Sequence, residues 1–164
     1  MEQTTYHANA VTIVACDPAH PDACGLIAEL SSTLATLTGD SGCAHFSVTD
    51  TRTARALFVL ACSADGTPLG CGALRPLHDT VAEAKRMYAR PGTRGVGAAL
   101  LAHLESAAVA FGYSALWLET RRVNTRAVNF YLRHGYREIP QYGPYVGRTD
   151  ALCLGKYLDH HATV

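Results

Sequence analysis

The sequence predicts a single α/β domain, spanning residues 1–164, in which helices flank a mixed, mostly antiparallel sheet. Segments with strand-like and helix-like patterns alternate along the chain, which is typical of two-layer and three-layer α/β architectures. A length of 164 residues suits one domain with one core, and no repeat, linker or low-complexity tract divides it. The expected order of elements is βααββ–β–αβαββ.

The first half of the chain is expected to hold a strand at 11–14, two helices and a hairpin. Pro21 suits the first turn of a helix that runs to Thr38, and a shorter helix is expected near 44–48. An apolar run marks a strand at 57–62, and the turn signal at 64–68 returns the chain as a strand at 69–74. The apolar positions of the long helix predict a buried stripe of Leu26, Ile27, Leu30, Leu34 and Leu37.

The second half begins with a strand at 80–89 that carries charge on both faces. Such charge is costly in a central strand unless it is paired or used. A helix from Gly97 to Phe111 follows, with its apolar stripe at Leu100, Leu101, Leu104, Ala107, Ala108 and Phe111. Asn124 suits the N-cap of a helix from Thr125 to Arg133. Strands are expected at 114–120, 136–139 and 151–157.

Composition narrows the class of partner. The formal net charge is +0, with 14 basic and 14 acidic residues, which argues against a nucleic-acid binder and against a polybasic membrane anchor. No apolar run approaches the roughly 20 residues that span a bilayer. Because the N-terminus is polar, without the features of a signal peptide, we expect a cytoplasmic protein. The six cysteines form no C-x-x-C pair, so we expect buried structural thiols rather than a metal site or disulfides.

The segment Arg94-Gly95-Val96-Gly97 joins the charged strand to the long helix. A glycine turn at a helix N-terminus exposes backbone N–H groups to an anion such as a diphosphate. The third glycine of a dinucleotide fingerprint is replaced by Leu100, and no Lys-Ser/Thr pair of a P-loop follows. A turn without any ligand is the alternative.

Two motifs together resemble the GNAT superfamily of N-acetyltransferases. The pattern R-G-x-G before a long apolar helix is similar to the family's motif A, although Gly92 stands where that motif usually begins with Gln or Arg. The pattern N-x-x-A-x-x-F-Y-x-x-x-G-Y, from Asn124 to Tyr136, is similar to its motif B. The resemblance implies a GNAT-like sheet and acetyl-CoA as cosubstrate, with no metal.

The resemblance also implies how the coenzyme is held. The backbone of Met87 and Ala89 would pair with the pantetheine amides like an added strand. Asn124 would cap its helix, contact the pantetheine arm, or both. Arg90 or Arg94 would hold a phosphate unless each is a solvated surface cation. The diphosphate cradle would comprise Gly92, Thr93, Arg94, Gly95, Val96, Gly97 and Ala98.

Acetyl transfer from a thioester to an amine needs a base that deprotonates the ammonium group and an acid that protonates the leaving thiolate. Glu83 occupies the strand on which the family often carries its base, and Glu119 on the next strand is the competing candidate. Either is alternatively a member of a structural ion pair. Tyr131 takes the motif B position whose tyrosine protonates the thiolate, and its alternative is a core aromatic.

The acceptor pocket is expected to include Glu119, Tyr142 and Tyr145, the tyrosines coming from a Pro/Gly/Tyr-rich loop. These residues favour a small cationic amine, and a peptide or protein amine is also possible. The predicted function is acetyl transfer by direct attack in a ternary complex, with no nucleic-acid or membrane partner and a possible homodimer. The alternative is a non-catalytic acyl-CoA-binding sensor or scaffold.

Overall fold

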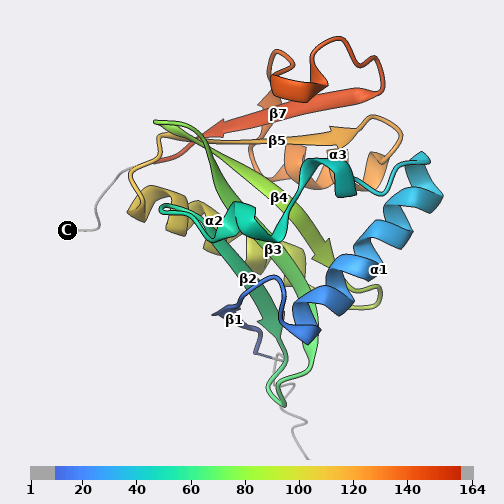
Figure 1. Cartoon of the computed structure of the whole chain (residues 1–164), viewed down its shortest axis with the longest axis vertical. Helices are drawn as coiled ribbons and strands as arrows, with labels where there is room; N and C mark the ends of the chain where they lie inside the picture. Colours follow the sequence, from blue (N-terminus) through green and yellow to red (C-terminus); the bar gives the residue numbers. More distant parts are fainter. Residues whose placement is uncertain (1–9, 160–164) are drawn as a thin grey trace, which may run out of the picture.

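A seven-stranded sheet with the strand order β1-β2-β3-β4-β5-β7-β6 forms the centre of the molecule (Figure 1). The computed structural model describes residues 10–159. The strands are β1 (Thr12–Ala15), β2 (Leu57–Cys62), β3 (Pro68–His78), β4 (Val81–Ala89), β5 (Ala115–Arg121), β6 (Arg137–Glu138) and β7 (Ala151–Tyr157). The α-helices are α1 (Pro21–Thr38), α2 (Val96–Ala110) and α3 (Thr125–Arg133).

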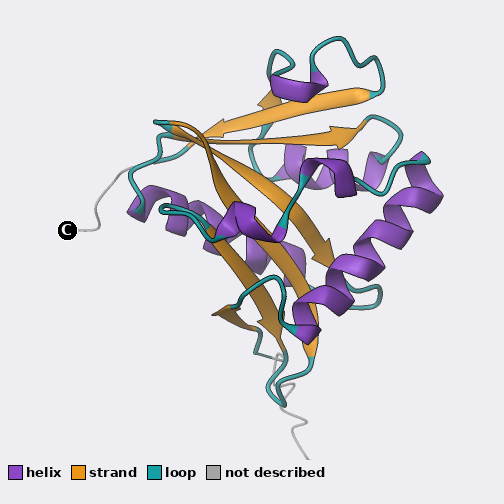
Figure 2. Cartoon of the chain, viewed as in Figure 1, coloured by secondary structure: helices purple, strands orange, loops and turns teal. Residues whose placement is uncertain are grey.

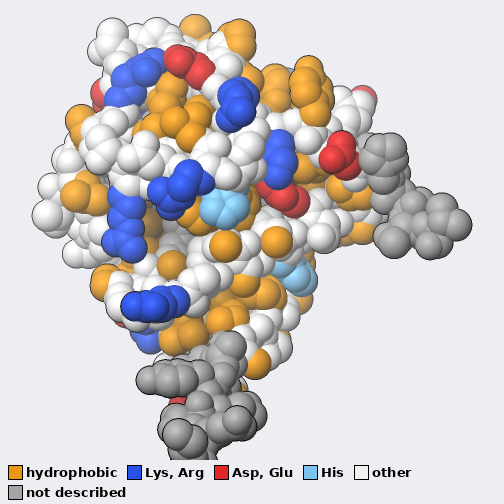
Figure 3. Space-filling model, turned by 180° about the vertical axis from the view of Figure 1, so that it is seen from behind, with side chains coloured by type: hydrophobic (Ala, Val, Ile, Leu, Met, Phe, Trp, Pro, Cys, Tyr) orange, Lys and Arg blue, Asp and Glu red, His pale blue; other side chains and the backbone are white. Residues whose placement is uncertain are grey.

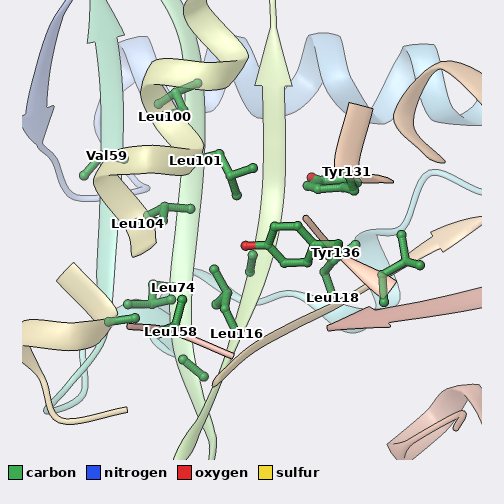
Figure 4. Packing of buried hydrophobic residues seen from close by; sticks show 14 of the residues in the cluster. Val59, Leu74, Leu100, Leu101, Leu104, Leu116, Leu118, Tyr131, Tyr136 and Leu158 are labelled. Atoms are coloured by element: carbon green, nitrogen blue, oxygen red, sulfur yellow. The ribbon is translucent and has the colours of Figure 1, made fainter. Parts of the chain in front are cut away.

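Helices cover both faces of the sheet (Figure 2). Helix α2 packs on one face, where Leu100, Leu101 and Leu104 point toward the strands (Figure 4). Helix α1 packs on the other face, with Ala23 and Leu26 against β2 and β3. Burial of these apolar side chains, at about 1.5–3 kcal/mol for each large one, is the main force that holds the layers together.

Strands β4 and β5 are the parallel pair of the sheet, and they separate soon after they meet. Their pairing runs only from Val81↔Ala115 to Glu83↔Trp117. Beyond Glu83, β4 continues beside β3 and β5 continues beside β7, and the two strands diverge (Figure 1). Where this parallel pair separates, main-chain groups and side chains of both strands are left without a partner on the facing strand.

A β-bulge interrupts β4 at Arg86. Cys71 lies opposite Tyr88 and Ala73 lies opposite Lys85, so Arg86 and Met87 together oppose the single residue between them on β3. Arg86 has a φ of 51°, a conformation that costs a non-glycine residue about 1–3 kcal/mol. The extra residue reverses the alternation of side chains along the rest of the strand.

The bulge corrects one expectation from strict alternation. That pattern predicts Met87 on the same face as Glu83 and Lys85, but Met87 packs against the α2 side of the core together with Ala84. Sequence alternation could not reveal this shift, because a bulge adds a residue without changing the polarity pattern of its neighbours.

The predicted fold class is confirmed, and several element boundaries coincide with the structure. Helices α1 and α3 and strand β7 have the predicted limits. The expected short helix near 44–48 is instead two 3₁₀ turns, Cys43–His45 and Val48–Thr51, separated where Phe46 and Ser47 become extended. Ser47 and Asp50 form a capping box that starts the second turn. The predicted burial of Leu37 is wrong, since it is 54% exposed at the end of α1.

The six cysteines are all free. Cys71 and Cys153 are buried as expected, but Cys24 and Cys43 are exposed, because α1 and the first 3₁₀ turn present them to solvent. None of the described helices is both long and apolar enough to cross a bilayer.

Candidate active site

A cavity of about 150 Å³ lies where β4 and β5 separate. Its walls come from the diverging halves of these strands, from α1 and the segment after it, and from the start of α3. The lining residues are Leu30, Leu34, Thr38, Asp40, Gly42, His45, Ala84, Lys85, Arg86, Met87, Leu118, Glu119, Thr120, Arg121, Asn124, Ala127, Tyr131 and Tyr145.

The glycine turn ends at the N-terminus of α2 and leaves space above its backbone. Gly92 and Gly95 have φ values of 81° and 72°, and a Cβ added at either would meet no atom within 4 Å. Gly95 is the N-cap of α2 and supplies no side-chain hydrogen bond, so the first N–H groups of the helix have no cap. Such a helix end suits an anionic group.

Gly97 and Phe130 bring α3 against the first turn of α2. A Cβ at Gly97 would lie 3.4 Å from two atoms of the Phe130 ring, so glycine permits this close approach. Arg126 and Arg133 are spaced from Phe130 by four and three residues and therefore flank it on α3. Both arginines are exposed. Several Lys and Arg side chains are visible from this side of the molecule (Figure 3).

Arg90 and Arg94, the two expected phosphate ligands, have different environments. Arg90 forms a double contact with Glu29, at 3.0 and 2.8 Å, and donates to the Pro68 carbonyl at 2.7 Å. Its donors therefore fasten the end of β4 to α1 rather than face the turn. Arg94 is exposed, and no carboxylate among residues 10–159 lies within 4.0 Å of it, which leaves it available to an anion.

Met87 and Ala89 lie on the part of β4 that has no partner on the β5 side, because pairing there stops at Glu83. An unpaired strand edge can accept an extended ligand as an additional strand. Asn124 forms the expected N-cap of α3, its side chain accepting from the Ala127 N–H at 3.3 Å, and it also lines the cavity.

Tyr131 lines the cavity from α3, and only 7% of it is exposed. Its ring packs edge-on against Phe130 and Tyr136, with centroids 5.1 and 5.6 Å away. Burial raises the pKa of the Tyr131 hydroxyl above its ordinary value, which keeps the proton on it at neutral pH. Figure 4 shows its hydroxyl end directed toward the central strands.

The two candidate bases occupy different environments. Glu83 is 1% exposed and does not line the cavity. Arg75 Nε donates to its Oε1 at 2.9 Å and Tyr142 donates to its Oε2 at 2.6 Å. Glu119 lines the cavity and is paired with Arg121. Burial raises the pKa of the Glu119 carboxyl above its ordinary value, and the nearby Arg121 opposes that shift.

Of the two tyrosines predicted for the acceptor pocket, only one lines the cavity. Tyr145 is 1% exposed and lines the cavity, where its hydroxyl accepts from Lys85 Nζ at 2.7 Å. Tyr142 belongs to the adjacent cluster with Trp117 and does not reach the cavity wall. The structure therefore brings together Glu119, Tyr131 and Tyr145, and places Glu83 and Tyr142 behind them.

Sequence reasoning missed five charged or titratable residues that line the cavity. Charge on both faces of β4 was a usable signal for Lys85 and Arg86. No local pattern indicated the others, which reach the cavity through tertiary contacts. The five are Asp40, His45, Lys85, Arg86 and Arg121. Among residues 10–159, no group of three or more His, Cys, Asp or Glu side chains is arranged to hold a metal ion.

The chain is similar to known acetyltransferases. A curated relative, an IAA acetyltransferase from Azospirillum brasilense, is 37% identical over 83 residues, which are 49% of this chain and 54% of the relative. The chain thus spans about half the length of that relative.

Solved structures match over nearly the whole chain. A protein from Klebsiella pneumoniae assigned to the acyl-CoA N-acyltransferases is 26% identical with a TM-score of 0.77, covering 91% of this chain and 98% of that one. An acetyltransferase from Streptococcus agalactiae shares the fold with 18% identity and a TM-score of 0.75, covering 90% and 98%. The profile of the Acetyltransferase (GNAT) family matches residues 27–136, more than half of the 164 residues. The chain belongs to the GNAT family of acetyltransferases.

Proposed function

We propose that this protein transfers an acetyl group from acetyl-CoA to a primary amine by direct attack in a ternary complex. The observation that carries the proposal is that Glu119 and Tyr131, a candidate base and a candidate acid, line one cavity between β4 and β5. Holding two reactants at attack distance supplies much of the rate of such a transfer, and the cavity lies where both could meet.

The glycine turn and the first turn of α2 fit the diphosphate of the coenzyme. Open space above Gly92 and Gly95, with the uncapped N–H groups of α2, provides the donors and the room that an anion needs. Arg94 adds a charge-assisted contact. The cradle residues are Gly92, Thr93, Arg94, Gly95, Val96, Gly97 and Ala98.

The pantetheine arm would follow the unpaired edge of β4. Main-chain groups of Met87 and Ala89 would bind its amides, and Asn124 would face it from α3. The bulge at Arg86 frees a main-chain donor from the ladder, and such a donor stabilises charge that develops on a carbonyl oxygen.

Glu119 would remove the proton from the attacking ammonium group, directly or through one water molecule. Burial raises the pKa of the Glu119 carboxyl, which makes its carboxylate a stronger base than that of an ordinary glutamate. Glu83 would act as a positioning residue, since Arg75 and Tyr142 already occupy its two oxygens.

Tyr131 would donate its hydroxyl proton to the leaving thiolate. Because burial raises the pKa of this hydroxyl, Tyr131 stays protonated until the thiolate forms beside it. Tyr131 lines the cavity, where its hydroxyl would face the sulfur.

The test combines calorimetry with a thiol-release assay. We expect acetyl-CoA to bind, and thiol to be released only when a suitable primary amine from a panel is present. Binding without turnover of any amine would favour the sensor or scaffold function instead. Absence of acetyl-CoA binding would contradict both functions.

A further inference from the structure

Arg86 is a buried cation with no carboxylate counter-ion in the part of the chain that the structure describes. Only 8% of the residue is exposed, and no carboxylate among residues 10–159 lies within 4.0 Å of its guanidinium. Its Nη1 donates to the Ser41 carbonyl at 3.0 Å, while its Nε is buried without a hydrogen-bond partner. The side chain lines the cavity.

Two nearby arginines, in contrast to Arg86, have carboxylate partners. Arg121 binds carboxylates of Asp40 and Glu119, and Arg75 binds Glu83 at 2.8 Å and Asp50 at 2.5 Å. Arg86 thus differs from these two arginines in having no carboxylate partner among residues 10–159. A buried charge is costly unless it is paired, so a site that keeps one unpaired fits an anionic ligand that completes it.

Lys85 adds a second cation without a carboxylate. Its Nζ donates to the Tyr145 hydroxyl at 2.7 Å, and no carboxylate among residues 10–159 lies within 4.0 Å. Consecutive residues of a regular strand point to opposite faces, but Lys85 and Arg86 line the same cavity. The bulge at Arg86 makes this possible, at the cost of a left-handed φ of 51°.

We propose that the acceptor amine also carries a carboxylate, which Arg86 and Lys85 bind, as in a small amino acid. Asp40 and Glu119 on the other wall would face its ammonium group, so the cavity presents both signs of charge to one zwitterion. This zwitterionic acceptor replaces the small cationic amine expected from the sequence, and it rests on the proposed acetyl transfer.

Matched pairs of acceptors test whether the protein recognises a carboxylate on the acceptor amine. Glycine, alanine and serine would each be compared with glycinamide, alaninamide and serinamide in the thiol-release assay. We expect kcat/KM for each acid to exceed that for its amide by about 10- to 100-fold, the range for a lost hydrogen bond between charged groups. Equal or better turnover of the amides would overturn the carboxylate while leaving acetyl transfer intact.

The Arg86→Gly variant tests whether Arg86 binds the carboxylate of the acceptor. Glycine adopts a positive φ without strain, so we expect a melting temperature equal to or above that of the wild type. We expect kcat/KM for the acids to fall about 10- to 100-fold and that for the amides to change less than about threefold. A structural role would instead lower the melting temperature and reduce turnover of acids and amides alike.

Arg55→Gly is the matched control, because Arg55 is the other described non-glycine residue with a positive φ, 60°. Its guanidinium binds the carbonyls of Phe111 and Asp79, away from the cavity. We expect this variant to lose stability and keep the preference for acids.

Thermal-shift measurements test the carboxylate site even if no amine is turned over. We expect the acids, added with coenzyme A, to raise the melting temperature of the wild type but not that of Arg86→Gly. No shift with any acid would contradict the carboxylate site, whereas absence of turnover alone would contradict acetyl transfer.

Discussion

Tyr142 donates a hydrogen bond of 2.6 Å to Oε2 of Glu83, at the last residue where β4 still pairs with β5. Arg75 occupies the other oxygen of the same carboxylate at 2.9 Å. This buried group therefore fixes the point at which the two strands separate, and it ties the 142–145 loop to that point. Glu83 does not line the cavity, whereas Glu119 does.

Glu119→Gln is expected to lower kcat/KM roughly 10²- to 10⁴-fold with little change in the dissociation constant of acetyl-CoA, because it removes only the proton acceptor. Wild-type activity should fall at acid pH with an apparent pKa above 4.5, since burial raises the pKa of this carboxyl. The variant should lose that acidic limb, as measured by the pH dependence of thiol release.

Glu83→Gln is the matched control for this assignment. It places an amide in a buried ion pair with Arg75, so we expect a lower melting temperature and an acidic limb that is retained. If the limb disappears in Glu83→Gln and persists in Glu119→Gln, the base is Glu83.

Tyr131→Phe is expected to lower kcat about 10- to 10³-fold with nearly unchanged acetyl-CoA affinity and stability, because the ring keeps its contacts with Phe130 and Tyr136. Single-turnover thiol release and calorimetry measure the two quantities. Full activity in Tyr131→Phe, together with unfolding of Tyr131→Ala, would identify a core aromatic with no part in the chemistry.

Gly95→Asp is expected to abolish acetyl-CoA binding while the protein stays folded, because a negative side chain would enter the space above the N-terminus of α2. Gly66→Asp is the control. Gly66 has a similar φ of 85° and similar open space, so it carries comparable backbone strain in the β2–β3 turn. Calorimetry should show loss of binding in Gly95→Asp alone, and equal loss in both variants would refute the cradle.

Lys85→Met is expected to stabilise the free protein by about 0.5–2 kcal/mol at neutral pH, because it removes a buried ammonium group. Burial lowers the pKa of Lys85 below 10.5, so its cost is present below the folded pKa and disappears above 10.5. Urea unfolding from pH 7 to 11 should show the gain shrinking as pH rises.

Lys156→Met serves as the comparison for that series. Lys156 has a carboxylate partner, Glu105, at 3.0 Å, so its removal should destabilise the protein slightly at neutral pH. A loss of stability in both variants would mean that the Lys85 contact with Tyr145 outweighs the cost of burying its charge.

The sequence by itself determined the order of elements, the glycine turn and the two helices beside it. These are local properties: Pro21 starts α1, Asn124 caps α3, and Gly95 provides the left-handed residue before α2. The motif position of Tyr131 predicted a site residue, and Tyr131 lines the cavity. Apolar periodicity also predicted the buried face of α2, because burial follows the helical repeat.

Only the tertiary structure decided which charged side chains share the cavity. The separation of β4 from β5 after Glu83 exposes Glu119 and hides Glu83, although both lie on strands with similar sequence character. One extra residue at Arg86 turns it to the same side as Lys85. Strand divergence and bulges depend on pairing across the sheet, which leaves no local pattern in a single chain. The charges that line the cavity therefore could not be read from the sequence.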